Sequence, residues 1–457
     1  MTISRLLIAN RGEIALRIVR AAKIKGIETV LAVSAADRDS QAAAEAGRAV
    51  VIGPAAARDS YLNGDLLVHT ASLTGCDAVH PGYGFLSERA AFAESCETAG
   101  LIFVGPKAET IRLVGDKLAA RALAKSAGVP MVSGSEKVDC VADALRIAED
   151  IGYPVITKAS AGGGGRGMVV ARSAADLEAS FDTASHTAKE AFGDGTLYLE
   201  RYVERARHVE VQVVGDGNGG ILHFAERDCS LQRRYQKMVE EAPAAILSDT
   251  LRSRLWQAAI DLLSPINYRN AGTVEFLYDE MDEQFYFMEV NARIQVEHPV
   301  SEEICDKDLI QLQLAVASGE PLDLLQSDIT PHGHAIEVRI IAEDPLNNFM
   351  PSPGRITNWV QPEGDGIRVD TAMSTGVSVP PFYDSMIAKL IVRGETRSDA
   401  VDRLRNALDS FVIEGISTNL DLLRFLVRQA DFIDNAIDTR WSERVLMPAY
   451  LSSKGIQ

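Results

Sequence analysis

Four consecutive glycines separate two short apolar stretches in the sequence "YPVITKASAGGGGRGMVV", residues 153–170. Glycine is poorly suited to the interior of a helix or a strand, so the run predicts a turn that joins two strands. A Walker phosphate-binding loop would carry a lysine–hydroxyl pair and open a helix, and this stretch does neither. Lys158 and Arg166 flank the glycines, whose backbone N–H groups can approach anionic oxygens closely. The pattern predicts a hairpin lid that closes over a triphosphate, with a merely mobile surface turn as the alternative.

The N-terminal stretch alternates between strand and helix patterns. Residues 5–10 and 28–34 are strand-like, and residues 13–26 place apolar side chains at helical spacing and end in Gly26. This order predicts a βαβ unit, and the same rhythm continues to about residue 113. No Gly-x-Gly-x-x-Gly turn lies between Ala9 and Ile14, which argues against a nicotinamide or flavin fold of the usual kind.

Two apolar strands surround an acidic turn in "AGTVEFLYDEMDEQFYFMEVNAR", residues 271–293. The hairpin places Glu275 and Glu289 on neighbouring strands, where their carboxylates can share a face. Two carboxylates at such a short distance repel each other unless a cation lies between them. Asn291 adds an oxygen ligand on the same face of the strand as Glu289. Hard oxygen ligands suit Mg²⁺, at ~2.0–2.1 Å, better than zinc.

The second strand continues into "MEVNARIQVEHP", where polar residues occupy every second position from 289 to 297. An extended chain turns alternate side chains to opposite faces, so these polar groups converge on one side. Taken alone, the pattern favours an amphipathic strand with its polar face in water. The other motifs are needed to decide whether this face is instead a functional site. We expect the segment to leave regular strand geometry before His298 and Pro299.

Composition limits the class of protein. A chain of 457 residues suggests two to four packed units, and from about residue 333 short strands followed by a helical pattern predict a separate α+β unit. The formal charge of −18 repels nucleic acid and anionic membranes. No run approaches the ~20 apolar residues of a membrane span. The 5 cysteines are scattered, which fits a reducing cytoplasm.

A series of blocks resembles, in order and at family spacing, the signature segments of biotin carboxylase, an ATP-grasp enzyme. They are "IANRGEIA", "HPGYGFLSE", "KASAGGGGRGM", "AERDCSLQRR", "EEAPA", "EVNARIQVEHPV", "RIIAEDP" and "FYDSMIAKL". The resemblance extends from about Leu6 to Leu423 and implies an α/β and α+β multidomain fold. It divides the chain into a Rossmann-like pre-ATP-grasp unit (1–113), an ATP-grasp unit (114–330, lid about 131–203), a biotin carboxylase-type α+β unit (331–447) and a tail (448–457).

The resemblance implies a ligase that converts MgATP and bicarbonate to carboxyphosphate and then carboxylates biotin. Its cofactors would be ATP and Mg²⁺ or Mn²⁺, and biotin would be a carrier-bound substrate that is not attached to this chain. The residues carried over for ATP are Lys117, Lys158, Gly163, Gly164, Gly165, Glu200, His208, Gln232, Tyr235, Glu275 and Glu289, and those for the metal are Glu275, Glu289 and Asn291. Those for bicarbonate are Lys237, Arg293, Gln295, Val296 and Glu297, and those for biotin are Tyr83 and Arg339. Glu297 would be the base, with Arg339, Lys237 and Arg293 completing the catalytic set.

The partners are also expectations from the resemblance. The usual biotin-bearing tetrapeptide Ala-Met-Lys-Met is absent and the chain ends soon after its third unit, so we expect a biotin carboxyl carrier protein and separate carboxyltransferase subunits. Acetyl-CoA, as in fatty acid biosynthesis, is the default acceptor; another acyl-CoA, a 2-oxo acid or a small amide is the alternative. A homodimer is expected: Arg20 and Arg368 match the family's contact residues, whereas Ile24 and Asp365 do not.

Two departures from the family pattern lie near the expected site. Tyr235 stands where the family often has histidine or asparagine, and Ala292 replaces a usual threonine. A weakened paralogue that binds ATP and serves as an assembly partner is therefore one competing hypothesis. Another is an ATP-grasp ligase that uses an acyl phosphate with a different nucleophile.

Overall fold

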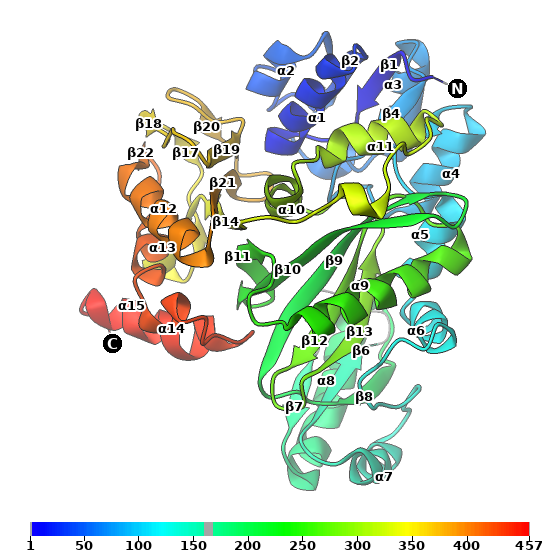
Figure 1. Ribbon diagram of the computed structural model, residues 1–457, viewed down its shortest axis with the longest axis vertical. Helices are drawn as coiled ribbons and strands as arrows, with labels where there is room; N and C mark the ends of the chain where they lie inside the picture. The colour runs from blue at the N-terminus through cyan, green and yellow to red at the C-terminus, as the bar shows by residue number, and fades with distance from the viewer. Residues whose placement is uncertain (1, 160–167, 457) are drawn as a thin grey trace.

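The computed structural model describes residues 2–159 and 168–456 (Figure 1). Its N-terminal unit is a parallel sheet with strand order β3-β2-β1-β4-β5. The predicted βαβ opening is confirmed by β1 (Arg5–Ile8), α1 (Gly12–Ile24) and β2 (Glu28–Ser34), with β1 and β2 parallel. The unit also contains β3 (Arg48–Gly53), β4 (Ala78–His80), β5 (Ile102–Phe103), α2 (Gln41–Glu45), α3 (Gly64–Leu73), α4 (Ala90–Thr98) and α5 (Ala108–Gly115).

The carboxyl ends of β1 and β4 bring two loops together. Asn10, just after β1, donates from Nδ2 to the carbonyl oxygens of Pro81 (2.6 Å) and Tyr83 (2.7 Å). Gly82 has a φ of +63°, and a Cβ there would meet Asn10 Nδ2 at 2.9 Å, so only glycine fits this close approach. The loop therefore presents Tyr83 at the edge of the sheet that faces the rest of the molecule.

A three-stranded antiparallel sheet, β7-β6-β8, lies at the lower end of the molecule in Figure 1. Its elements are β6 (Val155–Ala159), β7 (Val169–Ala171), β8 (Leu197–Arg201), α7 (Val141–Ile151) and α8 (Ala174–Phe192). Ala144 and Ala148, four residues apart on α7, are buried with Leu177 of α8 in a separate apolar cluster. The pairing of β6 with β7 confirms the predicted strands on either side of the glycine run, which itself lies outside the described residues.

An eight-stranded antiparallel sheet forms the centre of the molecule, with order β13-β12-β9-β10-β11-β14-β21-β19. Its strands are β9 (Ala206–Asp216), β10 (Ile221–Arg233), β11 (Gln236–Ala242), β12 (Arg269–Asp279), β13 (Gln284–Asn291), β14 (His334–Ile341), β19 (Ile367–Thr371) and β21 (Met386–Gly394). The predicted acidic-turn hairpin is confirmed by β12 and β13, where Glu275 pairs with Glu289. Because β14 pairs with β11, the sheet runs without a break from the central region into the C-terminal part of the chain.

Four further helices pack against the central sheet: α6 (Lys117–Ser126) against β13, α9 (Asp249–Leu263) against β10, α10 (His298–Cys305) against β10 and β14, and α11 (Leu309–Ala317) against β12. As expected, strand geometry ends before His298: β13 stops at Asn291, and the chain has no regular structure until α10 begins. Arg293, Gln295 and Glu297 therefore reach the site from an irregular segment and not from the face of a strand.

The C-terminal part packs α12 (Arg397–Ser410) onto β21. Thr396 caps this helix reciprocally with Asp399, and Leu404 and Leu408 lie in its buried core. The smaller elements are β15 (Glu343–Asp344), β16 (Met350–Pro351), β17 (Gly354–Arg355), β18 (Asn358–Val360), β20 (Ser378–Val379), β22 (Val412–Glu414), α13 (Leu420–Leu426), α14 (Ala430–Ile433) and α15 (Met447–Ser453). Across residues 2–159 and 168–456, no helix has the length and apolarity needed to cross a membrane.

Candidate active site

A cavity of about 1090 Å³ lies between the N-terminal unit, the three-stranded sheet and the central sheet. Every predicted site residue in the described part of the chain lines it: Tyr83, Lys117, Lys158, Glu200, His208, Gln232, Tyr235, Lys237, Glu275, Glu289, Asn291, Arg293, Gln295, Val296, Glu297 and Arg339. Gly163, Gly164 and Gly165 lie outside the described residues. Side chains separated by more than 200 positions in the sequence are therefore brought to one place.

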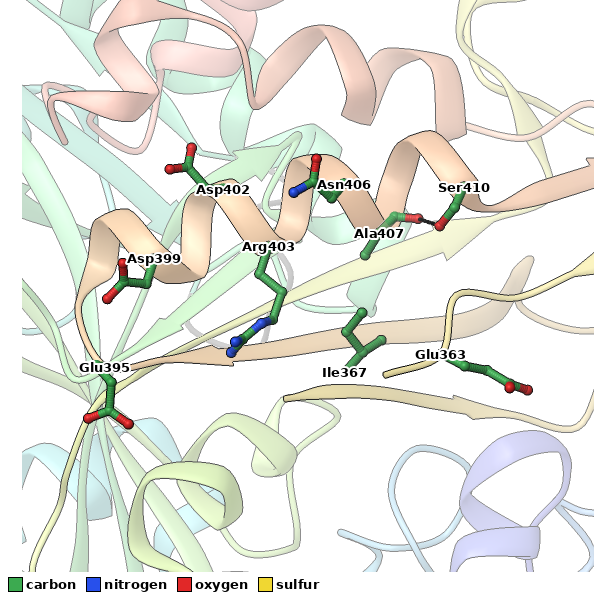
Figure 2. A pocket seen from close by; sticks show the side chains of 9 residues that line it. All are labelled: Glu363, Ile367, Glu395, Asp399, Asp402, Arg403, Asn406, Ala407 and Ser410. Carbon is green, nitrogen blue, oxygen red and sulfur yellow. Dashed lines mark hydrogen bonds between the residues drawn. The ribbon is translucent and has the colours of Figure 1, made fainter. Parts of the chain in front are cut away.

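A second pocket, of about 550 Å³, lies on the C-terminal part of the molecule (Figure 2). Figure 2 shows Arg403 extending from α12 toward the neighbouring strands, with acidic side chains at Glu363, Glu395, Asp399 and Asp402 around it. None of the predicted site residues lines this pocket. The larger cavity is therefore the candidate active site.

Glu275 and Glu289 face each other on β12 and β13 and form the candidate metal site. Burial would raise the pKa of Glu275, but Lys237 and then His208 hold it well below its ordinary value. Desolvation inside the cavity and then the charge of Glu275 raise the pKa of Glu289, although its side chain is exposed to the open cavity. Two neighbouring acids with pKa values pushed apart are typical of a functional carboxylate pair. With the amide oxygen of Asn291 at the end of the same strand, the donor set fits a hard divalent cation.

Lys237 places its ammonium group among three carboxylates. Its Nζ lies 2.6 Å from Glu210 Oε2, 3.1 Å from Glu275 Oε1 and 2.6 Å from Glu297 Oε1. Burial alone would lower the pKa of Lys237, but Cys229 and the three carboxylates raise it well above its ordinary value. The lysine therefore remains charged at neutral pH and joins the candidate metal site to Glu297.

Glu210 is a site residue that the sequence prediction missed. It is fully buried, and its Oε1 accepts a hydrogen bond of 2.6 Å from Arg227 Nε. The available signal was the alternation of His208, Glu210 and Gln212 with valines along β9. His208 Nε2 lies 3.2 Å from Glu275 Oε2. Burial opposes the charged imidazole, yet Glu275 raises the pKa of His208 to about 9.

Glu297 has a cation at each carboxylate oxygen. Its Oε1 accepts from Lys237 Nζ at 2.6 Å, and its Oε2 accepts from Arg339 Nη2 at 3.0 Å. Burial would raise the pKa of this fully buried carboxyl, but Lys237 and then Arg339 hold it below its ordinary value. Glu297 is therefore ionised at neutral pH, which is the state that a general base requires.

Arg293 organises the segment that follows β13. Its guanidinium donates to Glu88 Oε2 (2.7 Å), Gln295 Oε1 (2.6 Å) and Asn291 Oδ1 (2.9 Å). Glu88 also accepts from the backbone N–H of Ala292 at 3.0 Å, so this one carboxylate fixes both the side chain and the main chain. Glu88 was not predicted as a site residue, although it ends the quoted block "HPGYGFLSE".

A second buried lysine supports the opposite side of the cavity. Lys389 Nζ lies 3.2 Å from Glu13 Oε1 and donates to the carbonyl of Val296 at 2.8 Å. The hydroxyl of Tyr83 donates to the same oxygen of Glu13. Lys389 and Glu13 were not predicted, yet together they position Tyr83 and the peptide that precedes Glu297.

The far end of the cavity holds cations suited to phosphates. Lys117 is the first residue of α6, and burial followed by the nearby charge of Lys158 lowers its pKa against the effect of Glu289. Lys158 Nζ lies 2.5 Å from Glu200 Oε2, and Arg121 pairs with the other oxygen of Glu200. The carboxylate of Glu200 is thus already engaged by two cations.

Tyr235 lies at the rim of the cavity. It follows Arg234 in the turn between β10 and β11, and both residues have a positive φ, +47° for Arg234 and +65° for Tyr235. Its side chain is 58% exposed, unlike those of the buried catalytic candidates. The departure from the family pattern at this position therefore leaves the buried charge network intact.

A hairpin sheet beside a larger antiparallel sheet, with paired carboxylates and lysines lining the space between them, defines an ATP-grasp ligase. The model of the biotin carboxylase N-terminal domain matches residues 2–111, that of the carbamoyl-phosphate synthase L chain ATP-binding domain 116–325, and that of the biotin carboxylase C-terminal domain 337–444. The chain belongs to the biotin carboxylase family.

Known relatives and solved structures are similar to this chain over nearly its whole length. The chain is 49% identical to Biotin carboxylase 1 of Bacillus subtilis over 442 residues, 96% of this chain and 98% of that protein. It superposes on biotin carboxylase from Campylobacter jejuni with a TM-score of 0.93 at 44% identity, covering 97% of this chain and 99% of that one. The biotin carboxylase domain dimer of Hydrogenobacter thermophilus 2-oxoglutarate carboxylase, solved with MgADP, ADP and bicarbonate, gives 0.92 at 44% identity, with coverage of 97% and 98%.

Proposed function

We propose that this cavity carboxylates biotin in two steps, with Glu297 as the base that activates bicarbonate. The observation that carries the proposal is the bridge of Glu297 between Lys237 at 2.6 Å and Arg339 at 3.0 Å. One carboxylate oxygen thus faces the cation proposed for bicarbonate and the other faces the cation proposed for biotin. The proton that Glu297 takes from bicarbonate is therefore held next to Arg339, the residue proposed to bind biotin.

ATP occupies the end of the cavity that holds Lys117 and Lys158, which neutralise its phosphates. His208 and Gln232, whose side chains lie 2.9 Å apart, face the ribose, and Tyr235 lies beside the nucleotide at the rim. Because Arg121 and Lys158 already engage the carboxylate of Glu200, we assign adenine recognition to the backbone around Glu200. Gly163, Gly164 and Gly165 complete the proposed ATP set from outside the described residues.

Glu275, Glu289 and Asn291 would hold Mg²⁺ or Mn²⁺. The ion supplies positive charge to the phosphates and to the acyl phosphate that forms. Lys237 and His208 form ion pairs with Glu275, the same carboxylate that the metal would use.

Bicarbonate binds between Lys237, Arg293, Gln295 and the backbone of Val296. Bicarbonate is a poor nucleophile until it loses its proton, so the ionised Glu297 accepts that proton while Lys237 and Arg293 offset the resulting dianion. Attack on the terminal phosphate then gives carboxyphosphate and ADP. Lys389 holds the carbonyl of Val296, which fixes this peptide.

Biotin binds against Tyr83 and Arg339. Its ureido nitrogen then bonds to the carboxyl carbon of carboxyphosphate, the bond from that carbon to the phosphate oxygen breaks, and the departing phosphate takes up the N–H proton. Negative charge develops on the ureido oxygen as the proton leaves, and the guanidinium of Arg339 stabilises that enolate. We assign the biotin to a separate carrier protein and the transfer to carboxyltransferase subunits, with acetyl-CoA as the acceptor. The 2-oxoglutarate carboxylase among the similar structures keeps a 2-oxo acid as the second candidate.

We also infer a homodimer and a cytoplasmic location. Arg20, which matches the family's contact residues, lies on α1 with a side chain that is 51% exposed, as an interface residue would be in a free protomer. The cysteines are all free of disulfides in the described chain, which suits a reducing compartment.

The experiment is ADP release by the purified chain with MgATP and a high concentration of free biotin, with and without bicarbonate. We expect release to require both bicarbonate and biotin. Release without bicarbonate would contradict the proposal. If ATP binds and no ADP is released, a biotinylated carrier protein distinguishes strict carrier dependence from a weakened paralogue.

A further inference from the structure

Two buried glutamates face each other behind Arg339. Glu240 on β11 and Glu337 on β14 are direct partners in the antiparallel register, and both are fully buried. Residues opposite each other in such a pair have Cβ atoms about 4.5–5.5 Å apart, and like charges at that position are destabilising. The chain nevertheless places two acids there, one of which contacts the guanidinium proposed for biotin.

The hydrogen bonds of the two acids are unequal. Oε1 of Glu240 accepts from Arg339 Nε at 2.6 Å and lies 2.5 Å from Arg339 Nη2. Oε2 of Glu240 and both carboxyl oxygens of Glu337 have no hydrogen-bond partner among the described residues. A buried carboxylate anion without a partner carries a large desolvation penalty, whereas a protonated carboxyl gains an O–H donor for a neighbouring oxygen. Burial also raises the pKa of Glu240, to about 7, but Glu240 and not Glu337 pairs with Arg339, so the geometry favours one proton for the pair, on Glu337.

The charges packed around Glu337 support this distribution. From β21 comes Lys389, which instead contacts Glu13 of α1, and from β14 itself comes Arg339, which contacts Glu240. Glu297, just before α10, and Glu240 on β11 are both negative neighbours. Burial raises the pKa of Glu337 well above its ordinary value: Lys389 and Arg339 lower it, Glu240 and Glu297 raise it, and burial is the largest of these effects.

We propose that Glu337 is a positioning residue that stays protonated, donates to Glu240, and so leaves Arg339 with Glu240 as its one fixed anion. This inference rests on the proposed function, because the role of Arg339 at biotin comes from it. When Glu297 takes the proton of bicarbonate, Glu240 remains the charged partner of Arg339. If Glu337 were also ionised, its added negative charge would oppose an enolate forming at the guanidinium.

A spectroscopic experiment tests the protonation state without turnover. The infrared spectrum of the wild-type protein at pH 7 should contain a buried carboxylic-acid C=O band that is missing from the Glu337→Gln spectrum. Absence of any such difference would overturn the proposal. An unfolded Glu337→Gln protein would also count against it, because the amide matches a neutral acid in shape and charge but would leave Lys389 short of an anion if Glu337 were ionised.

Kinetics tests the positioning role. Glu337→Leu removes the donor to Glu240, and we expect kcat for biotin carboxylation to fall by about tenfold or more while the KM for MgATP changes little. Glu337→Gln, which keeps an N–H donor and no charge, should restore most of that loss. Equal losses in both variants would overturn the proposal. If wild-type enzyme shows no bicarbonate-dependent ADP release, the proposed function fails while the infrared result still decides the state of Glu337.

Discussion

Lys237 Nζ and Glu297 Oε1 lie 2.6 Å apart at the centre of the cavity, although 60 positions separate them in the sequence. The lysine comes from β11 and the glutamate from the irregular segment before α10, so their contact depends on how the central sheet is assembled. Each group alters the other: the lysine lowers the pKa of Glu297, and the carboxylate helps to keep the ammonium charged. This reciprocity is the physical basis for the expected effects of substitution.

Replacing Glu297 by Gln should leave MgATP binding intact and reduce bicarbonate-dependent ADP release by about 100-fold or more, the contribution expected from a general base. The amide keeps the shape of the side chain but cannot accept the proton. ATP affinity and ADP release should be measured on the same preparation. Glu94→Gln is the matched control, because Glu94 is an exposed acid on α4. Undiminished turnover in Glu297→Gln would remove the base assignment.

His208 should make unfolding depend on pH. Its pKa in the folded protein is about 9 against an ordinary 6.5, so its stabilising contribution is fully present below about pH 6.5 and is lost as pH rises to about 9. We expect the free energy of unfolding without ligands to fall by on the order of 3 kcal/mol over that range. Urea unfolding at several pH values measures this change.

Two histidine variants separate this effect from general alkaline destabilisation. His208→Gln should flatten the dependence, whereas His186→Gln, at an exposed position on α8, should retain it. A wild-type protein that is equally stable at pH 6.5 and pH 9 would contradict the assignment of a charged His208.

The sequence predicted those parts of the site that are encoded locally. The two apolar strands around an acidic turn, with Glu275 and Glu289 on neighbouring strands, follow from local patterns. Their direct pairing also depends on a register shift between Glu275 and Phe276, without which the hairpin would place Glu275 opposite Met288. Glu210, Glu88 and Lys389 were missed because their roles depend on contacts with distant segments. Nothing in the sequence near Lys389, for example, indicates that its ammonium reaches the carbonyl of Val296.

The local sequence patterns also could not predict how far the central sheet extends. Short strands after residue 333 predicted an α+β unit, but the pairing of β11 with β14 is a long-range register. That pairing brings Arg339 to Glu240 and Glu297. The family resemblance was enough to predict Arg339 as a site residue, but its contacts with these two glutamates could be found only from the structure.

Replacing Glu289 by Gln should weaken metal binding more than nucleotide binding. Removing one of two opposed carboxylates leaves a neutral amide oxygen, and we expect the Mg²⁺ concentration for half-maximal ADP release to rise by about tenfold. Titration of Mg²⁺ at saturating ATP measures this shift, with Glu283→Gln at the exposed hairpin turn as the control. An unchanged Mg²⁺ requirement would remove Glu289 from the metal set.

Replacing Arg339 by Lys should separate the two half-steps. Nε of Arg339 donates to Glu240, while Nη2 donates to Glu297 and also lies 2.5 Å from Glu240, and a lysine ammonium cannot reproduce that fork. We expect biotin carboxylation to fall by about 100-fold, because the enolate loses its main stabilising group, while the affinity for MgATP stays within about twofold. Isothermal titration with ATP and a biotin-dependent ADP assay measure the two quantities. Arg428→Lys is the matched control, since Arg428 forms a half-exposed pair with Asp409 far from the cavity lining. A comparable loss of ATP affinity in Arg339→Lys would assign the residue to the general architecture of the cavity and not to biotin.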